Sequence, residues 1–552
     1  MRGFPKLLIG WAGFRRDAVP LALASVTAGL IAAVATHRPL ANGPAEWQWA
    51  YRPAGLSPAG AAVAAAALAG ALAAWGWLAR EKSAPAAVPI GSGAPALLVL
   101  AGGVFTLALV AAEPGGFGRV FDSLVSRNSF GYVWDAGLAP PARELLADYP
   151  AASSGLNQHS VTHPPGPLLA VRALDLLGRR LGEPAPGESG LAGAAARAIT
   201  RALDRAHDRR RPVPEPPPSA WTLVALAFLL PALSALAAWP LYRLALLWGL
   251  ERSAALLAAL FWVVVPARSL FTPSFDQALP AVLLPAALLA TGRGGRGSDS
   301  ADSANGANGA NRAGGAAAGF RAFGAGALAW LACFLSYGCL AFLPLLLPLA
   351  AHPIRLPGAS DQTPAHSIKL PALLAAGFLL PWLALAAATG FDAWSAFRAA
   401  LALHHKIAVA PRAYATWLLF NPYDFALLLG PALLGLSAAA LFQPSRPRLD
   451  PPAPATSGDP PARLGADQSE TSAPAWRLAL RAWWVLLAVL LLSGGVRGEV
   501  GRIWLPWMPF ACLFAAAAAA ARWGARHPLT WLLVLLQAAL LFTLAANLVF
   551  VS

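Results

Sequence analysis

The chain has 552 residues, of which 57% are apolar and 12% charged, and its formal net charge is +15. The apolar residues form long blocks without charge, and a block of about twenty such residues crosses a bilayer core of about 30 Å as a helix. Its basic residues lie in short segments between the blocks, and no basic stripe carries interleaved aromatic residues. The composition therefore argues for an integral membrane protein and against a nucleic-acid partner.

The apolar blocks predict an all-α, polytopic membrane protein of about thirteen transmembrane helices. In chain order the predicted spans cover about residues 18–36, 57–79, 95–112, 220–244, 253–268, 276–291, 322–335, 337–351, 370–389, 424–442, 482–494, 503–521 and 528–550. The first of them follows a basic segment and is longer than the apolar part of a cleaved signal peptide, so we expect an uncleaved signal anchor. The three cysteines all lie in apolar segments, and no disulfide framework is expected.

Lysine and arginine residues predict the orientation, because they concentrate in cytoplasmic loops. Their distribution favours a cytoplasmic N-terminus, an extracytoplasmic C-terminus and a location in the plasma membrane. Six regions follow from this topology. They are residues 1–94 with two extra helices, a core at 95–291 with a large outer loop at 113–219, a disordered cytoplasmic linker at 292–321, helices at 322–442 with an outer loop at 390–423, a second disordered linker at 443–481, and C-terminal helices at 482–552.

Three segments carry a resemblance to a known superfamily. The outer loop contains "THPPGPLL" at 162–169, residues 241–290 run from "LYRLALLWG" to "FTPSFDQALPAVLLPAALLA", and residues 501–518 read "GRIWLPWMPFACLFAAAA". In this order they resemble the GT-C integral-membrane glycosyltransferases, in particular the protein O-mannosyltransferases and the aminoarabinose-type lipid transferases. The resemblance covers residues 95–521. It implies an enzyme that takes a sugar from a polyprenyl-phosphate donor at the outer membrane face and delivers it to a lipid, polysaccharide or protein of the cell envelope.

Such a transfer needs a carboxylate for the acceptor hydroxyl and cations for the leaving phosphate. The resemblance places an acid before Tyr132, where this chain has Asn128, so either Asp135 or Asp122 substitutes for it or the chain is inactive. We expect Asp135 more than Asp122 to be the catalytic acid, because Trp134 and Tyr132 would desolvate it. A solvated loop charge is the alternative for each.

His159 and His163 have the spacing of a metal-binding pair on a helix. Because Pro164 pushes His163 out of the helical region, the two rings are not expected to share a helix face. His163 is instead expected to donate a hydrogen bond to a phosphate or a loop carbonyl, or to be a structural turn residue. The stretch that follows, 165–178, is too short and too charged to span and predicts an interfacial helix. No cofactor is expected, and a divalent metal is left open as an alternative that no motif indicates.

Basic residues of the outer rim are the candidate donor-phosphate ligands. Arg502 is the first choice, because its planar guanidinium can grip two oxygens, although pairing with Glu499 is the alternative. The other candidates near the same face, including supporting acids, are Arg497, His404, His405, Lys406, Asp276 and Asp424. Asp276 at the start of a predicted span could also be a helix N-cap without a function.

Ser336 stands where the resembling enzymes have a lysine before Tyr337, which removes one phosphate contact. Two other readings of the chain remain: a carrier or flippase of lipid-linked sugars, which would need polar groups at the bilayer midplane, and a catalytically inactive scaffold of this superfamily.

Overall fold

The structure is a computed structural model, and it describes residues 4–38, 50–52, 55–79, 93–209, 212–291, 304–351, 365–443 and 475–550. Within these ranges the regular structure is helical, and the only β pairing is an isolated bridge between Tyr51 and Leu548. The predicted all-α class is therefore confirmed.

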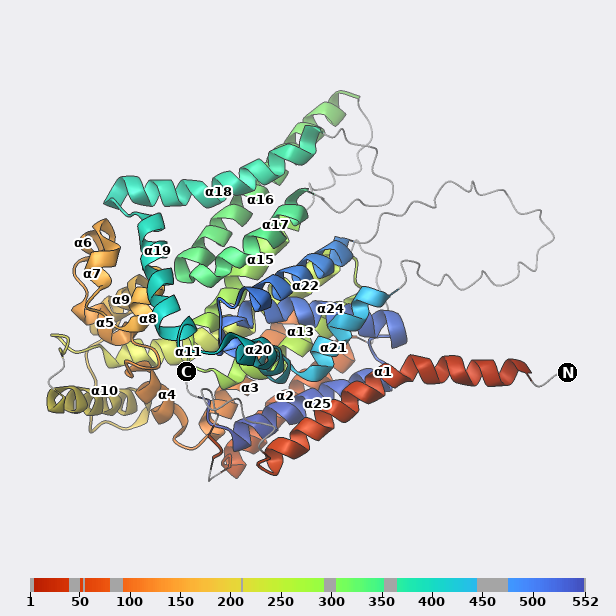
Figure 1. The fold of residues 1–552 in the computed structure, drawn as a ribbon, viewed down its shortest axis with the longest axis horizontal. Coiled ribbons are helices and arrows are strands. Elements are labelled where there is room, and N and C mark those ends of the chain that lie inside the picture. The colour runs from red at the N-terminus through yellow and green to blue at the C-terminus, as the bar shows by residue number, and fades with distance from the viewer. Residues whose placement is uncertain are drawn as a thin grey trace.

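A body of apolar helices forms most of the molecule (Figure 1). Its N-terminal half consists of α1 (Phe4–Ala35), α2 (Pro58–Leu78), α3 (Gly93–Ala112), α11 (Ala220–Leu236), α12 (Ala238–Leu247), α13 (Arg252–Val263), α14 (Pro266–Leu270), the 3-10 helix η2 (Phe275–Ala278) and α15 (Leu279–Thr291). Its C-terminal half consists of α16 (Ala304–Leu335), η3 (Tyr337–Phe342), α17 (Leu343–Ala351), α18 (Ala365–Thr389), α19 (Ala393–His404), the π-helical turn η4 (His405–Val409), α20 (Tyr414–Leu429), α21 (Pro431–Ala439), η5 (Ala440–Phe442), α22 (Ala475–Ser493), α23 (Val500–Ile503), η6 (Leu505–Trp507), α24 (Met508–Trp523) and α25 (Pro528–Asn547).

Nine helices in the described ranges are long and apolar enough to cross a membrane, or ten if the bent pair of 414–429 and 431–442 counts as one span. Three further apolar helices of 10–17 residues occupy the remaining predicted spans, namely Arg252–Val263, Phe275–Thr291 and Tyr337–Ala350. Each of the thirteen predicted segments is thus helical, but length and composition support nine to ten spans. A polytopic membrane protein is confirmed at that coarser level.

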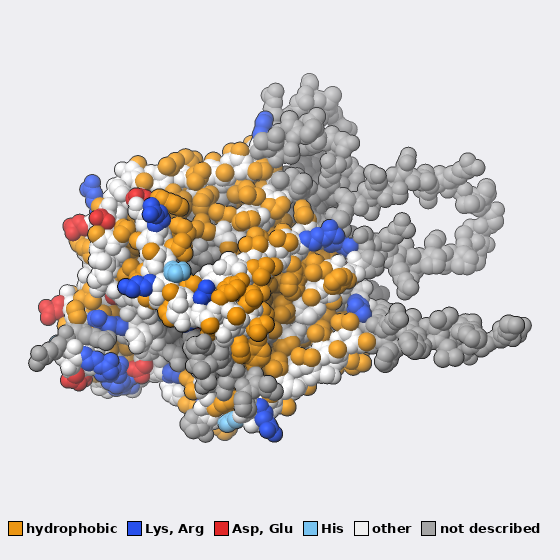
Figure 2. All heavy atoms as spheres, viewed as in Figure 1, with side chains coloured by type: hydrophobic (Ala, Val, Ile, Leu, Met, Phe, Trp, Pro, Cys, Tyr) orange, Lys and Arg blue, Asp and Glu red, His pale blue; other side chains and the backbone are white. Residues whose placement is uncertain are grey.

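The short apolar helices and the long ones differ in how deeply they are buried in the body. Every residue of α13 from Ala254 to Val263 is buried, as expected for a helix that is apolar all round and packed inside a bundle. By contrast, only 11% of the residues in the most apolar stretch of α18 are buried, so this helix lies at the edge of the body. Figure 2 shows apolar side chains across the middle of the body and charged ones toward its two ends, the distribution of a membrane-spanning protein.

The segment that the sequence assigns to a large outer loop folds into seven helices that form one end of the molecule (Figure 1). They are α4 (Gly116–Leu124), α5 (Tyr132–Leu138), α6 (Ala142–Ala147), α7 (Tyr149–Ser153), α8 (Gln158–Thr162), α9 (Gly166–Arg179) and α10 (Gly190–Asp208). We call this region, residues 113–219, the outer-loop domain. Its side chains form an apolar cluster with residues of α3, α11, η2 and α19, and this cluster is distinct from the main cluster of the helical body.

The predicted interfacial helix corresponds to α9, and one face of it is buried in the outer-loop domain. Leu168 and Val171 are fully buried, whereas Leu176, Leu177 and Leu181 are 56–70% exposed. The first turns of the helix therefore pack against the rest of the outer-loop domain. Its C-terminal end exposes a cluster of leucines, which suits contact with a lipid surface.

The two predicted linkers differ from the structure at their edges. Helix α16 begins at Ala304, well inside the segment expected to be disordered. Helix α22 begins at Ala475, a few residues before the expected end of the second linker. The rest of both linkers, 292–303 and 444–474, lies outside the described residues.

Candidate functional site

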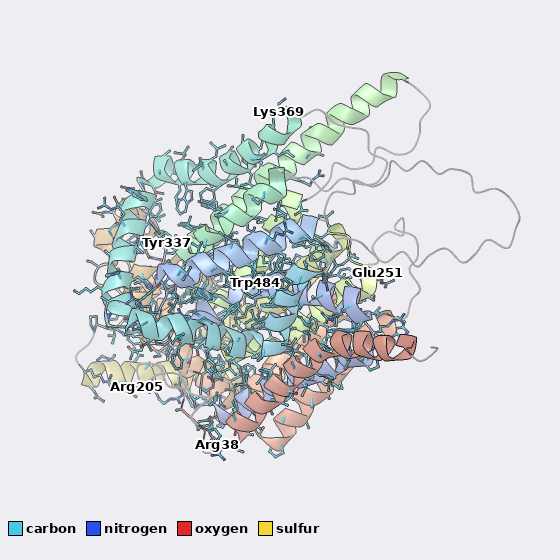
Figure 3. All side chains as sticks on the ribbon, turned by 45° about the vertical axis from the view of Figure 1, so that its right-hand side comes forward. Arg38, Arg205, Glu251, Tyr337, Lys369 and Trp484 are labelled. Atoms are coloured by element: carbon cyan, nitrogen blue, oxygen red, sulfur yellow. The ribbon has the colours of Figure 1, made fainter. Side chains whose placement is uncertain are left out.

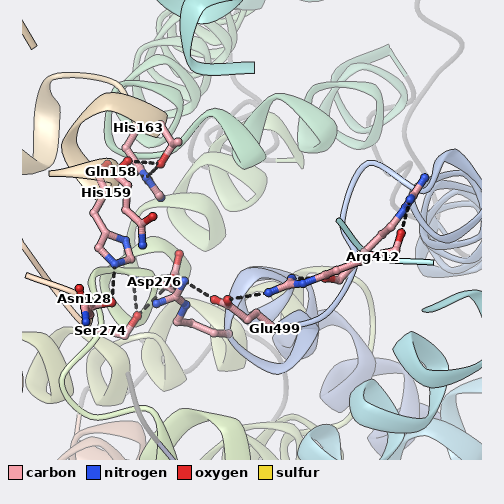
Figure 4. A network of polar contacts seen from close by, with 11 residues as sticks. Asn128, Gln158, His159, His163, Ser274, Asp276, Arg412 and Glu499 are labelled. Atoms are coloured by element: carbon pink, nitrogen blue, oxygen red, sulfur yellow. Dashed lines mark hydrogen bonds and ion pairs between the residues drawn. The ribbon is translucent and has the colours of Figure 1, made fainter. Parts of the chain in front are cut away.

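A pocket lies where the outer-loop domain meets the helical body, and Figure 4 shows the polar contacts around it. It is small, with a volume of about 20 Å³, roughly the room of one water molecule. The residues that line it come from the turn before α5, from α8, from η2, from the end of α16 and from α23. They are Ser129, Phe130, Tyr132, His159, His163, Pro273, Ser274, Phe275, Asp276, Leu279, Leu335, Ser336 and Arg502.

The proline after His163 shapes this wall as predicted. His159 lies in α8, whereas His163 ends that helix with extended backbone angles of φ −115° and ψ 161°, so the two rings do not share a helix face. The Nδ1 atom of His163 lies 2.9 Å from the carbonyl oxygen of His159, and the Nε2 atom of His159 lies 3.0 Å from that of Asn128. Each ring donates a hydrogen to a loop carbonyl and keeps its other nitrogen as an acceptor.

Both imidazoles are held neutral. Burial, together with the nearby His159 and Arg502, lowers the pKa of His163 to about 3. Burial also lowers the pKa of His159, against a smaller opposing effect of its bond to Asn128. Neutral rings accept a hydrogen bond from a hydroxyl group but add no positive charge for a phosphate.

Asp276 is the only acid that lines the pocket, and the local fold fixes its position. Ser274 caps η2 in a capping box with Gln277, and the Ser274 hydroxyl donates a hydrogen bond of 2.9 Å to the Asp276 carboxylate. The Nε atom of Arg502 lies 3.5 Å from the same carboxylate oxygen. The N-cap alternative fails for Asp276 itself, because Ser274 holds that position.

Arg502 belongs to a chain of alternating charges. Its Nη2 atom lies 2.6 Å from Glu499, and the other oxygen of Glu499 lies 3.9 Å from Arg412. Glu499 has a φ of 58°, an unfavourable backbone conformation for a residue with a side chain. Strain of this kind, worth about 1–3 kcal/mol, is typical of functional sites. Arg502 thus pairs with Glu499 and also lines the pocket, and its role as a ligand of the donor phosphate stays a prediction.

The charge on Arg502 is secure. Burial disfavours the cation, but Glu499 and Asp276 outweigh that cost and raise the pKa of Arg502 above its ordinary value. An anion in the pocket would therefore meet a permanent positive charge.

The remaining basic candidates lie in two places. Arg497 donates hydrogen bonds to the backbone of residues 409 and 412 and stacks over Tyr414 at 5.5 Å, so it braces the loop before α23. His404 lies 3.1 Å from the carbonyl oxygen of Gly495, while His405 and Lys406 are exposed on the η4 turn. None of these four residues lines the pocket.

The two loop acids favoured by the sequence lie outside the pocket. Asp135 is 2% exposed, and its carboxylate accepts hydrogen bonds from the backbone of Asn157 at 2.9 Å and the hydroxyl of Ser160 at 2.6 Å. It thereby ties α5 to α8, and burial raises its pKa. Asp122 forms an exposed ion pair of 2.9 Å with Arg201. Tyr132, in contrast, lines the pocket and donates to the carbonyl of His159.

Asp424 occupies the interior of the helical body and not the outer rim. It is 1% exposed, and neither carboxylate oxygen has a hydrogen-bond partner in the described structure. It lies in α20, which bends by 102° against the helix that follows. A second charged residue, Arg268, is also fully buried and bonds to Gly102 and Thr106. Two charged residues, one of them a candidate assigned to the outer face, thus lie inside the helical body.

The described residues contain no group of three or more His, Cys, Asp or Glu side chains that could hold a metal ion. Sequence reasoning missed Ser129 and Ser274 in the pocket and weighed His159 only as a metal ligand. Lone serines carry no spacing signal, so nothing in the sequence could have selected them.

Comparisons of the chain with family models, curated proteins and solved structures find no match.

Proposed function

We propose that the chain is a membrane glycosyltransferase that moves a sugar from a polyprenyl-phosphate donor to a cell-envelope acceptor at the extracytoplasmic face. The observation that carries the proposal is the pairing of Asp276 with Arg502 in the pocket, between the outer-loop domain and the apolar body. A lipid-linked sugar phosphate would present its headgroup at this boundary while its chain stays in the bilayer.

The chemistry assigns one role to each charged group. The acceptor hydroxyl oxygen attacks the anomeric carbon, and the bond from that carbon to the phosphate oxygen breaks, so that polyprenyl phosphate leaves with the electron pair. Asp276 takes the proton of the hydroxyl as general base. The geometry favours Asp276 over Asp135 and Asp122 for this role, because it alone of the three lines the pocket.

The charged groups beside the pocket also suit a phosphate leaving group. The charge chain contains Arg502, Arg412 and the neighbouring Arg497 against the two carboxylates of Asp276 and Glu499, which leaves a surplus of one positive charge. Arg502 is the cation of this group that lines the pocket. A preorganised guanidinium there stabilises the negative charge that develops on the phosphate.

Substrate binding requires the pocket to widen, because a sugar does not fit into about 20 Å³. Its walls belong to separate elements, the outer-loop domain on one side and η2 with α23 on the other. Separation of these walls is the expected response to the donor, a gating motion common in enzymes that exclude water.

Asp276→Asn tests the proposal directly. In membranes supplied with radiolabelled polyprenyl-phosphate sugars, we expect this variant to lose at least about 100-fold of the transfer rate, the usual contribution of a general base, while it still binds donor. Arg502→Ala should weaken donor binding. Asp122→Asn, whose acid is exposed, is the matched control and should transfer normally. Normal transfer by Asp276→Asn would remove Asp276 from the reaction, and the absence of transfer by the unaltered chain with any donor would leave the inactive scaffold.

A carrier of lipid-linked sugars is the second candidate, because one observation favours it. A broken helix with a buried, unpartnered acid, as in α20 and Asp424, is typical of ion-coupled transporters. In proteoliposomes, a chain that moved a labelled lipid-linked sugar between leaflets without transferring the sugar would support the carrier and contradict the enzyme.

A further inference from the structure

A second hollow runs along the membrane-facing side of the body, between α12 and α15. Its volume is about 320 Å³, the lower end of the range for ligand pockets. Leu279 lines the first pocket, whereas the α15 residues of this groove lie about half a helical turn away from it. The residues that line the groove are Leu236, Trp239, Pro240, Arg243, Ala281, Pro285 and Leu288.

Small and kinked positions open the groove. Helix α11 ends at Leu236 and α12 starts two residues later, Pro285 interrupts α15, and Ala281 provides little side-chain volume. The indole of Trp248 lies 3.4 Å from Thr291, which shows that the two helices run side by side below the groove. From Leu236 to Arg243 the groove is about 10 Å long, at about 1.5 Å per residue.

Arg243 is the only charged residue of the lining, and it lies at the end of the groove. Within the part of the chain that the structure describes, its side chain forms no ion pair or hydrogen bond, and Glu251, the nearest acid in sequence, does not pair with it. An arginine near the end of a membrane-spanning helix extends its guanidinium to the headgroup level. The phosphate of a lipid is the partner that this position offers.

The place of Arg243 in the membrane identifies the leaflet. It lies 23 residues after Ala220, where the chain leaves the outer-loop domain, and a helix of that length is about 35 Å long. By this length Arg243 reaches the end of the body opposite to the outer-loop domain, which is the end where Figure 3 shows Glu251, the residue before α13. Trp239, one turn earlier, is the residue type that prefers the headgroup level of a membrane.

We propose that this groove binds one anionic phospholipid of the leaflet opposite to the candidate site. One acyl chain lies along the groove between α12 and α15, and the phosphate contacts Arg243. The apolar lining supplies affinity through buried methylene groups, and the single guanidinium selects for a lipid with negative charge. The proposal does not depend on the transferase activity.

Native mass spectrometry of the full chain tests this site. Protein purified in phosphatidylcholine and exchanged into mixtures with phosphatidylglycerol should retain about one phosphatidylglycerol molecule. Arg243→Gln should lower that affinity about fivefold, the effect of about 1 kcal/mol for one basic residue at an anionic membrane surface. Ala281→Trp should fill the groove and abolish retention, and Ala281→Leu serves the same purpose if the tryptophan variant does not fold.

Arg481→Gln is the matched control, because Arg481 is an exposed arginine in the first turns of the membrane-spanning α22 and lines neither pocket. It should retain phosphatidylglycerol as the unaltered chain does. Equal retention of phosphatidylcholine and phosphatidylglycerol, or unchanged retention in both the Arg243 and the Ala281 variants, would overturn the proposal. Displacement of the bound phosphatidylglycerol by equimolar polyprenyl phosphate would also overturn it, since the groove would then belong to the sugar donor.

Discussion

Single side chains decide the chemistry that the pocket can support. Asp276 is anchored by Ser274 and faced by Arg502, so a base and a cation are held within ion-pair distance of each other. Neither depends on a flexible loop, because both lie in short helical turns at the start of larger helices. Preorganisation of this kind is what electrostatic catalysis requires.

The neutral His163 predicts a pH effect on stability. Burial holds its pKa in the folded chain near 3, while an unfolded chain has a histidine pKa near 6.5. Between these values the unfolded state binds more protons, so the free energy of unfolding falls as the pH drops from 7 toward 4. At pH 5 the loss from this residue should be about 1–2 kcal/mol.

His163→Asn tests this effect, because asparagine replaces the Nδ1–H donor without a titrating ring. Melting temperatures measured in detergent between pH 4 and 8 should fall less steeply for this variant than for the unaltered chain. His405→Asn, at an exposed position, should leave the slope unchanged. An identical slope in the His163 variant would show that the ring does not stay neutral in the folded protein.

At the scale of elements, close helix contacts hold the edge of the body together. Helices α16 and α18 cross at two glycines, and a methyl group at either Gly326 or Gly377 would lie 2.0 Å from a carbonyl oxygen of the other helix. Small residues that allow such an approach are the usual basis of helix packing in membranes, where apolar burial gives no drive for association. The end of α16 lines the pocket, so this crossing also supports the site.

Gly326→Ala should therefore destabilise the α16–α18 pair. The added methyl group would force the helices apart at a cost of about 1–3 kcal/mol, and thermal unfolding in detergent should start at a lower temperature. Gly70→Ala in α2 is the control, because its methyl group would meet open space, and it should be neutral or slightly stabilising. Equal melting of the two variants would show that the crossing is looser than the structure indicates.

At the scale of the whole molecule, a buried ion cluster connects distant parts of the chain beside the outer-loop domain. Glu113, after α3, lies 2.7 Å from both Arg52 and Arg119. Arg52 also donates a hydrogen bond of 2.7 Å to the backbone of Leu548 near the C-terminus. The loop after α1, the start of the outer-loop domain and the end of the chain thus meet at one point.

The sidedness of the molecule can be tested at its two ends. Figure 3 shows Arg205 in the outer-loop domain and Glu251 at the other end of the body. The native cysteines at 333, 339 and 512 are buried, so single cysteines introduced at 205 and 251 will dominate labelling. A membrane-impermeant maleimide added to intact cells should label Arg205→Cys, and it should label Glu251→Cys only after permeabilisation. The reverse pattern would place the pocket on the cytoplasmic side and contradict the proposed transfer at the outer face.

The sequence by itself determined the class of the protein. Apolar blocks of about twenty residues have one stable form in a bilayer, which is helix, and all thirteen predicted segments are helical. The break at Pro164 was also predictable, because the clash of a proline ring with the preceding residue is local. Arg502 and Asp276 were among the candidates for a similar reason, since charges beside apolar blocks are conspicuous.

Only the tertiary structure decided which of these residues meet. Asp276 and Arg502 are more than two hundred residues apart, and their contact depends on how η2 and α23 pack. The same packing buried Asp135 against Asn157 and Ser160 and left Asp122 exposed beside Arg201. Local sequence fixes the type of a side chain and its secondary structure, but burial and neighbours come from the arrangement of distant helices, and these set the charge and reach of each candidate.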